Sequence, residues 1–257
     1  QQDGIVFGSD FERFSFRVNM DNDINKWLTT GLRASVARTK QTNSVDGSGA
    51  IYNALNQLPE VPARNPDGSF GMQTENMYGT YFSNPLSDLI QNENYSRSTQ
   101  VYVNAFADIK LWKGLVFRTE YAANYNYNTG YRFTPSYDYE FFKQQSSASR
   151  SAGNGSNWTL KTYLTYNGTF GKHNVSVMAG HEAQENNWES LDGSRTNFLF
   201  NSVHELNAGD ATTAKANSSR GSSAIESYFG RLNYNFADRF LLTATLRADG
   251  SSSFAKE

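Results

Sequence analysis

The chain has 257 residues, a formal net charge of −2 and no cysteine. The lack of cysteine excludes disulfide frameworks and thiolate metal sites, and without a basic excess no nucleic-acid partner is expected. No apolar run reaches the roughly 18 residues that a transmembrane helix requires. A helical membrane protein is therefore excluded, whereas a membrane β-barrel is not. Aromatic residues make up 14% of the chain although only 38% is hydrophobic, a composition that favours many strands joined by polar loops.

Eight segments alternate between apolar and polar residues with the period of a β-strand. In the first of them, Phe14, Phe16 and Val18 share one face, while Arg13 and Arg17 share the other. Several segments are about 10 to 13 residues long, close to the length with which a tilted strand crosses a bilayer. In chain order the segments lie at 14–20, 28–36, 100–111, 115–127, 158–170, 175–182, 228–236 and 240–249.

The predicted connections between these segments alternate between short and long. Tight turns are expected at 21–23, 112–114, 171–173 and 237–239, and long polar loops at 40–98, 128–157 and 186–225. Short periplasmic turns at one end and long extracellular loops at the other are typical of outer-membrane barrels. The pattern therefore predicts an all-β, antiparallel, meandering barrel wall of about eight strands.

Charged residues within the eight segments take one parity of the alternation. A lipid-facing Lys or Arg near the bilayer midplane would cost about 2–4 kcal/mol, so their exclusion from the apolar face is expected. A sandwich core would exclude charge equally, but polar residues along whole strands favour a wet barrel lumen. The predicted lumen-facing polar residues, with a structural role or a role in the solute path, are Arg13, Arg17, Arg33, Asp108, Lys110, Arg118, Glu120, Lys161, Arg231, Arg247 and Asp249.

No catalytic or metal-binding pattern is present in the sequence. The three histidines, His173, His181 and His204, share no ligand spacing, so surface roles are favoured over a metal site. The sequence predicts neither an enzyme nor a cofactor. Arg231, Arg247 and Asp249 fit an ion-pair ladder that braces a barrel wall better than a substrate site.

The C-terminal part of the sequence carries a family resemblance. Residues 228–236, 239–247 and 249–254 resemble the barrel hallmark of the SusC/RagA-type TonB-linked outer-membrane transporters, and residues 11–21 resemble an earlier hairpin of the same family. The hallmark positions in this sequence are Tyr228, Phe229, Gly230, Arg231, Tyr234, Arg247, Asp249, Gly250, Ser251, Ser252 and Phe254.

This resemblance implies a larger barrel of about 22 strands with an N-terminal plug, in a Bacteroidetes-type outer membrane. It implies TonB-driven import of oligosaccharides or peptides, with a SusD-like surface lipoprotein as a lid. Residues 1–257 would then be one partial barrel domain, with the plug, the TonB-contacting segment and the C-terminal strands outside them. Aromatic residues of the long loops could contact ligand or lid, although loop packing explains them equally well: Tyr78, Tyr81, Phe82, Tyr137 and Tyr139.

Two other architectures fit the same alternation. A complete eight-stranded outer-membrane barrel, an adhesin or narrow porin, requires the strand that contains Phe14 to pair with the strand that ends near Ala248. A soluble all-β carbohydrate-binding module requires the apolar faces of two sheets to meet in a dry core. A curved open sheet with its apolar side outward would exclude both.

Overall fold

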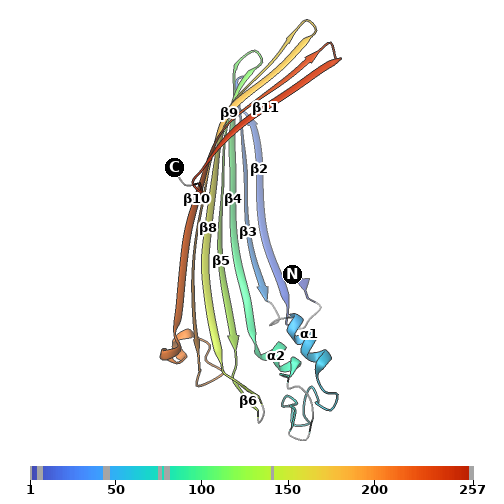
Figure 1. Cartoon of the computed structure of the whole chain (residues 1–257), viewed down its shortest axis with the longest axis vertical. Coiled ribbons are helices and arrows are strands. Elements are labelled where there is room, and N and C mark those ends of the chain that lie inside the picture. The colour runs from blue at the N-terminus through green and yellow to red at the C-terminus, as the bar shows by residue number, and fades with distance from the viewer. Residues whose placement is uncertain are drawn as a thin grey trace.

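The computed structural model is a long, curved antiparallel sheet with its helices gathered at one end (Figure 1). Nine strands follow one another across the sheet in chain order, and each is hydrogen-bonded to the next. Their bounds are β1 Gln2–Asp3, β2 Asp10–Asp23, β3 Leu28–Thr42, β4 Glu93–Trp112, β5 Leu115–Thr134, β8 Ser147–Phe170, β9 His173–Thr196, β10 Lys215–Phe236 and β11 Phe240–Ser251. The structure describes residues 2–4, 8–42, 47–74, 77, 82–139 and 142–254.

All eight predicted segments are strands of this sheet. They lie within β2 to β5 and β8 to β11, and every neighbouring pair is antiparallel, so the predicted meander is confirmed. In an antiparallel pair, directly opposed residues point to the same side of the sheet. Phe16 is opposed by Val36, which is opposed by Val101. The apolar parities of successive strands therefore form one continuous face.

The tight turns are those predicted, with one exception. Gly114 and Gly171 have φ values of +79° and +59°, a backbone region that favours glycine. Ala237 and Asp238 both have positive φ, and the N–H of Arg239 donates to the carbonyl of Phe236 at 3.0 Å, so residues 237–239 connect the paired residues Phe236 and Phe240. The turn predicted at 21–23 is wrong, because these residues continue β2 and residues 24–27 make the connection.

The side chain of Asn25 organises that first turn. Its Oδ1 accepts hydrogen bonds from the backbone N–H groups of Trp27 and Leu28, both at 2.9 Å. The acidic residues at 21–23, which suggested a turn, lie within the sheet instead. Asp21, for example, forms an ion pair with Arg33 at 3.3 Å. A polar side chain that has a cross-strand partner was thus mistaken for a turn former.

The long connections are shorter than predicted. Their predicted bounds of 40–98, 128–157 and 186–225 all overlap strand, since β4 begins at Glu93, β8 at Ser147 and β10 at Lys215. Most residues of these strand ends are polar or small on both faces, so the alternation is weak there, but backbone pairing continues through them without interruption. The β9–β10 connection, for example, is reduced to residues 197–214.

The connections also contain helices and a small hairpin that the sequence pattern did not predict. The longest connection, between β3 and β4, holds α1 (Gly47–Asn56) and α2 (Pro85–Gln91), and the next holds the hairpin of β6 (Tyr137–Tyr139) and β7 (Phe142–Gln144). Two short 3₁₀ turns, Leu206–Ala208 and Ala211–Thr213, lie between β9 and β10. None of the described helices is long and apolar enough to cross a membrane.

Asn84 joins the pieces of the β3–β4 connection. Its side chain caps α2 by accepting from the N–H groups of Leu86 and Ser87, and it donates to the carbonyls of Ala63 and Gly71. Nearby, partial burial raises the pKa of the Asp88 carboxyl, and hydrogen bonds from Ser83 and Asn53 offset part of that rise.

The described residues bury very few hydrophobic side chains. The buried ones are confined to the connections and the strand ends beside them: Val61, Tyr131, Phe133, Tyr137, Ala148 and Phe198. On the apolar face, in contrast, Phe14 is 75% exposed and Leu246 is 79% exposed. Among the described residues, no second sheet packs on this face to form a dry core, so the soluble sandwich is wrong. The closed eight-stranded barrel is wrong as well, because β1 and β11 are the two ends of the described strand order.

Candidate functional site on the polar face of the sheet

The polar face is the side of the sheet opposite the apolar face. The register places all eleven predicted charged residues on it; for example, Asp108 is opposed by Arg118, and Glu120 by Lys161. Asn104 and Ser227, which lie on this face, are 6% and 0% exposed. Burial of strand residues on a single sheet layer indicates that side chains converge here, as they do on the concave side of a barrel wall.

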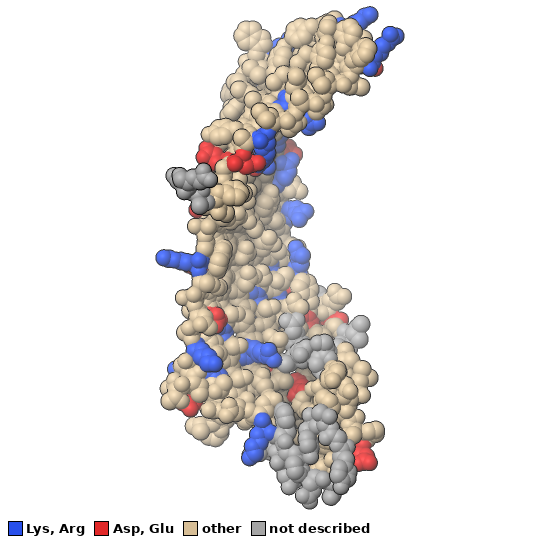
Figure 2. Space-filling view, viewed as in Figure 1, with Lys and Arg blue, Asp and Glu red and all other residues tan. Residues whose placement is uncertain are grey.

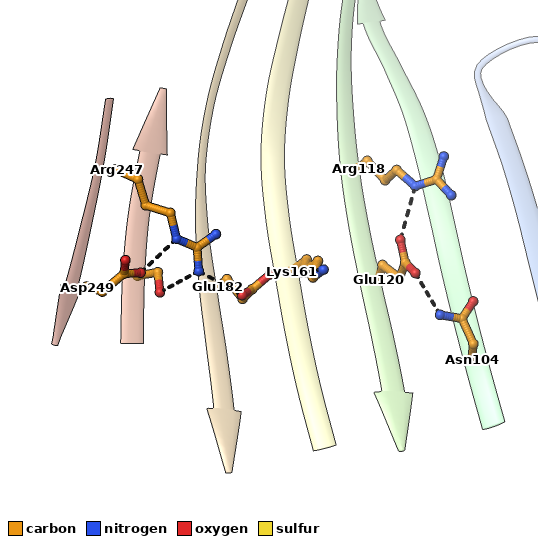
Figure 3. Close-up of polar contacts among 8 residues, drawn as sticks. Asn104, Arg118, Glu120, Lys161, Glu182, Arg247 and Asp249 are labelled. Carbon is orange, nitrogen blue, oxygen red and sulfur yellow. Dashed lines mark hydrogen bonds and ion pairs between the residues drawn. The ribbon is translucent and has the colours of Figure 1, made fainter. Parts of the chain in front are cut away.

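Glu182 is the centre of the best-connected cluster on this face (Figure 3). It accepts from Lys161 Nζ at 3.0 Å and from Arg247 Nη2 at 3.1 Å, and its side chain is only 14% exposed. The same guanidinium contacts Asp249 at 2.7 Å and the hydroxyl of Ser227 at 2.9 Å. Four adjacent strands, β8 to β11, are thereby linked by side chains in addition to their backbone pairing.

Glu182 is the charged residue of this cluster that the sequence prediction did not include. The alternation that defines β9 is the weakest of the eight, because small and polar residues occupy both of its faces. The parity of Ser176, Gly180 and Glu182 nevertheless matched the polar face. A rule that every charged residue of polar parity is a candidate would have included it.

A second cluster on the polar face joins β4 to β5. Arg118 contacts Asp108 at 3.4 Å and Glu120 at 3.7 Å, and Asn104 donates to Glu120 at 2.7 Å. The ring of Phe106 lies between two guanidinium groups, with Arg118 at 4.2 Å and Arg33 at 5.1 Å from its centroid. Cation–π contacts of this kind fix the orientation of the guanidinium groups along the wall.

Four predicted polar residues are not part of these clusters. Arg13, Arg17, Lys110 and Arg231 form no ion pair with any described residue, although all four share the polar face. The first two line a hollow on that face together with Tyr102, Gln100, Asn124 and Asn157. This hollow offers cationic donors, amides and one phenol to a polar solute.

The hallmark residues form the β10–β11 hairpin. Tyr228, Gly230 and Tyr234 lie on its apolar face, while Phe229, Arg231, Arg247 and Asp249 lie on its polar face. Gly250 and Ser251 end β11, and the hydroxyl of Ser252 accepts a hydrogen bond from the N–H of Ala224. Phe254, at the end of the described chain, is 77% exposed. The 249–252 segment is therefore a strand end with local hydrogen bonds.

The loop aromatics are only partly described. Tyr78 and Tyr81 lie outside the described residues, as does the side chain of Tyr139. Phe82 packs edge-on against Tyr52, with 6.1 Å between the ring centroids. Tyr137 is 7% exposed, which favours loop packing over ligand or lid contact for this residue.

The apolar face is bordered by aromatic residues near both ends. Toward the long connections, Trp158 lies beside Tyr121, and its Nε1 donates to Glu185 at 3.1 Å. On β10, the hydroxyl of Tyr228 donates to Glu226, which also contacts His181 at 3.0 Å. Toward the tight turns, Phe236 stacks on Phe240. An indole or phenol that has one apolar side and one hydrogen-bonded tip is typical of a membrane–water boundary.

The described residues contain no group of three or more His, Asp or Glu side chains that could hold a metal ion. His173 and Tyr234 share a hydrogen bond of 2.7 Å, His181 contacts Glu226, and His204 contacts Glu93 at 3.3 Å. The three histidines therefore lie in three separate places.

Curated proteins that resemble the chain along nearly its full length are TonB-dependent receptors. It is 30% identical to TonB-dependent receptor P3 of Formosa agariphila over 264 residues, which cover 99% of this chain and 26% of that protein. It is 26% identical to TonB-dependent receptor SusC of Bacteroides thetaiotaomicron over 283 residues, which cover 99% of this chain and 27% of that protein. The SusC/RagA resemblance is confirmed. No protein-family model matches the chain.

Solved structures show the same fold for this chain. The sheet matches the RagAB peptide transporter with a TM-score of 0.76 and 20% identity, over 96% of this chain and 28% of that one. It matches the siderophore receptor PiuA from Acinetobacter baumannii with a TM-score of 0.54 and 10% identity, over 98% of this chain and 37% of that one. The chain spans about a quarter of the length of the curated relatives it matches, whose names describe receptors and not enzymes.

Proposed function

We propose that the chain is part of the wall of a TonB-dependent importer in a bacterial outer membrane. The observation that supports this most strongly is the two-sided sheet, whose apolar face is half-buried to exposed, with no second layer of described residues over it, while its opposite face is polar and crowded. Such a sheet is stable where lipid covers one side and water or protein the other. The resemblance to TonB-dependent receptors along 99% of the chain supports the same proposal.

The membrane would cover the half of the sheet next to the tight turns. The aromatic borders described above mark the two edges of this band, with the tight turns in the periplasm and the long connections outside the cell. Beyond the aromatic border on the side of the long connections, the strands continue into water as a polar extension. In this orientation α1, α2 and the β9–β10 connection are extracellular.

The polar face would line the route of the imported solute. The charges of the Glu182 cluster cancel, and Arg118 pairs with both carboxylates of its own cluster, so the role of the two clusters in this proposal is to hold neighbouring strands in register. In the hollow next to Arg13 and Arg17, both guanidinium groups are without an ion-pair partner among the described residues and can donate hydrogen bonds to a solute. Oligosaccharides and peptides both carry dense hydrogen-bonding groups, and either class suits such a surface.

The partners follow from the same proposal. A SusD-like surface lipoprotein would close over the extracellular connections as a lid, and the TonB complex would supply energy through parts of the transporter outside this chain. Nothing in the described polar face has the geometry of a catalytic centre, so the wall itself guides solute and does not transform it.

Uptake by cells that produce the whole transporter tests this proposal. Cells carrying an Arg13→Gln/Arg17→Gln double variant are expected to take up a fluorescent oligosaccharide or peptide substrate more slowly, at an equal amount of folded barrel in the outer membrane. A matched Lys113→Gln/Lys172→Gln variant removes the same charge from two tight turns and should leave uptake unchanged. Uptake that is independent of TonB, or a protein found outside the outer membrane, would contradict the proposal.

A further inference from the structure

Three cations lie together on the outward side of the sheet, just beyond the apolar face. Arg38 and Lys40 follow Val36 on β3, and Arg97 precedes Val101 on β4, all with the parity of the apolar face. Lys40 is directly opposed by Arg97. Arg38 and Arg97 are exposed. We call Arg38, Lys40 and Arg97 the basic cluster.

The basic cluster is not neutralised by its surroundings. Directly opposed like charges destabilise a pair of strands unless something compensates them. Glu12 is opposed to Lys40 from β2, but none of the three cations forms an ion pair with a described residue. Arg97 instead lies over the ring of Tyr95, with its guanidinium carbon 5.1 Å from the centroid. Asp10 has the same parity as Glu12 and is opposed to Thr42, so the three cations and these two carboxylates leave a charge of about +1 on this patch, which is complementary to an anion.

The location of the cluster indicates which anion would reach it. In the proposed orientation, Val36 and Val101, the opposed pair next to the cluster on the side of the tight turns, contact the outer ends of the lipid chains, while Phe14 lies directly opposite Arg38. Headgroups then lie at the height of the cluster, and cations next to a membrane surface attract anionic lipid, by about 1 kcal/mol each. Guanidinium groups match the phosphate group in geometry as well as in charge.

A groove leads away from Arg97 along the same outward side. It is lined by Tyr95 of β4, Thr129 of β5, Ala152 of β8 and Leu191 of β9, among others. The lining also includes Arg150 and Asp192, so the groove offers a sugar ring beside the phosphate position both aromatic surface and charged hydrogen-bonding groups. A plain phospholipid headgroup would leave this groove empty.

We propose that the basic cluster and the adjoining groove bind the phosphorylated sugar headgroup of an outer-leaflet glycolipid. The phosphate contacts Arg38, Lys40 and Arg97, and the sugar enters the groove. This inference rests on the proposed outer-membrane location of the wall. It assigns a lipid site to the outside of the barrel, away from the solute path.

Binding of the purified whole transporter to lipid nanodiscs tests the proposal. The probes are diphosphorylated lipid A, its dephosphorylated form and phosphatidylglycerol, each at the same low fraction in phosphatidylcholine. The Arg38→Gln/Lys40→Gln/Arg97→Gln variant is expected to bind diphosphorylated lipid A on the order of a hundredfold more weakly, since each cation contributes about fivefold. Dephosphorylated lipid A should bind the unaltered protein with a similar loss.

Three controls separate this site from general electrostatic attraction. The Lys113→Gln/Lys172→Gln/Arg239→Gln variant removes equal charge at the tight turns, where Figure 2 shows Lys and Arg at the end of the molecule, and should change binding less than twofold. Glu12→Gln should strengthen binding about fivefold. Thr129→Trp, which fills the groove, should weaken binding of lipid A but not of phosphatidylglycerol.

Several outcomes would overturn the lipid site. These are equal losses in the two triple variants, lipid A binding that does not depend on its phosphates, or displacement of lipid A by millimolar inorganic phosphate alone. If uptake and outer-membrane location are normal while the basic cluster has no effect, only this inference fails. If the protein is not in the outer membrane, the proposed function fails first.

Discussion

The two ends of β10 differ in what their side chains contact. Residues 228–236 alternate strictly, with Tyr228, Leu232 and Phe236 on one side and Phe229 and Arg231 on the other. Residues 215–226 carry mainly Ser, Asn, Lys, Arg and Glu on both sides, yet they pair with β9 as regularly. The comparison teaches that alternation records the surroundings of a strand, while backbone hydrogen bonds maintain the strand itself.

The two ends of the sheet also differ in how apolar groups are covered. In the half next to the tight turns, they are exposed to what we propose is lipid. In the half next to the long connections, Tyr131, Phe133 and Ala148 are covered by Phe198 and Leu206 of the β9–β10 connection. Arg150 holds the same connection through Glu205 at 3.0 Å. In this half, the β9–β10 connection covers the apolar side chains that lipid would cover in the other half.

The largest expected effect comes from opening that protein cover. The ring of Phe133 meets Phe198 edge-on at 5.6 Å and stacks on His204 at 4.0 Å. Phe133→Ala should destabilise the docked connection by about 3–5 kcal/mol. Hydrogen exchange should then rise in residues 197–214 while the strands near the tight turns stay protected. Phe16→Ala, the same truncation on the apolar face, should leave exchange in the connection unchanged; equal effects would remove the distinction between the halves.

A charge placed on the outward side should distinguish the two halves directly. Leu232→Arg lies within the proposed lipid band and should cost about 2–4 kcal/mol of membrane-inserted stability. Ser218→Arg has the same parity on the same strand but lies in the proposed extracellular extension, so it should cost less than about 1 kcal/mol. Urea unfolding of the barrel in lipid vesicles measures both, and equal costs would contradict the proposed band.

A smaller effect is expected from the polar clusters. Glu182→Gln weakens contacts with Lys161 and Arg247 and should destabilise the wall by about 2 kcal/mol, since hydrogen bonds to charged groups contribute about 1.5–3 kcal/mol. On the same strand, Glu189 accepts an exposed hydrogen bond from Asn154, and Glu189→Gln should change stability by about 0.5 kcal/mol or less. The same unfolding assay compares the two, and a loss at Glu189 as large as that at Glu182 would show that the cluster does not brace the wall.

The smallest effect is a pH dependence confined to the β3–β4 connection. Because burial raises the pKa of Asp88, the folded connection binds this proton more tightly than the unfolded one. Its contribution to stability is therefore fully present below the ordinary pKa of 3.8 and is lost as pH rises through the raised value. Hydrogen exchange around α2, corrected for intrinsic rates, should be slower at pH 3.5 than at pH 7. Asp88→Asn should abolish this difference, and its persistence in the variant would assign the pH dependence to another group.

The sequence predicted the sheet where the surroundings of its two faces differ. Alternation located all eight strands, and the parity of Arg33, Asp108 and Lys161 correctly placed them on one face. It failed where both faces meet water, which is why β8 and β10 were expected to begin about ten residues too late. Glu182 was missed because its strand mixes small and polar residues, and α2 was missed although Asn84 and Pro85 are a recognisable helix start.

Accessibility along β10 tests the lipid-facing sheet most directly. The chain has no cysteine, so single cysteines at successive positions from 216 to 236 can each carry a spin label in the membrane-inserted transporter. The account predicts that oxygen and a water-soluble nickel relaxant reach alternate residues from 228 to 236, with oxygen favoured at the even positions, and that the nickel relaxant reaches both parities from 216 to 226. Even positions from 228 to 236 that are closed to oxygen, or that contact the nickel relaxant as freely as their odd neighbours, would contradict it.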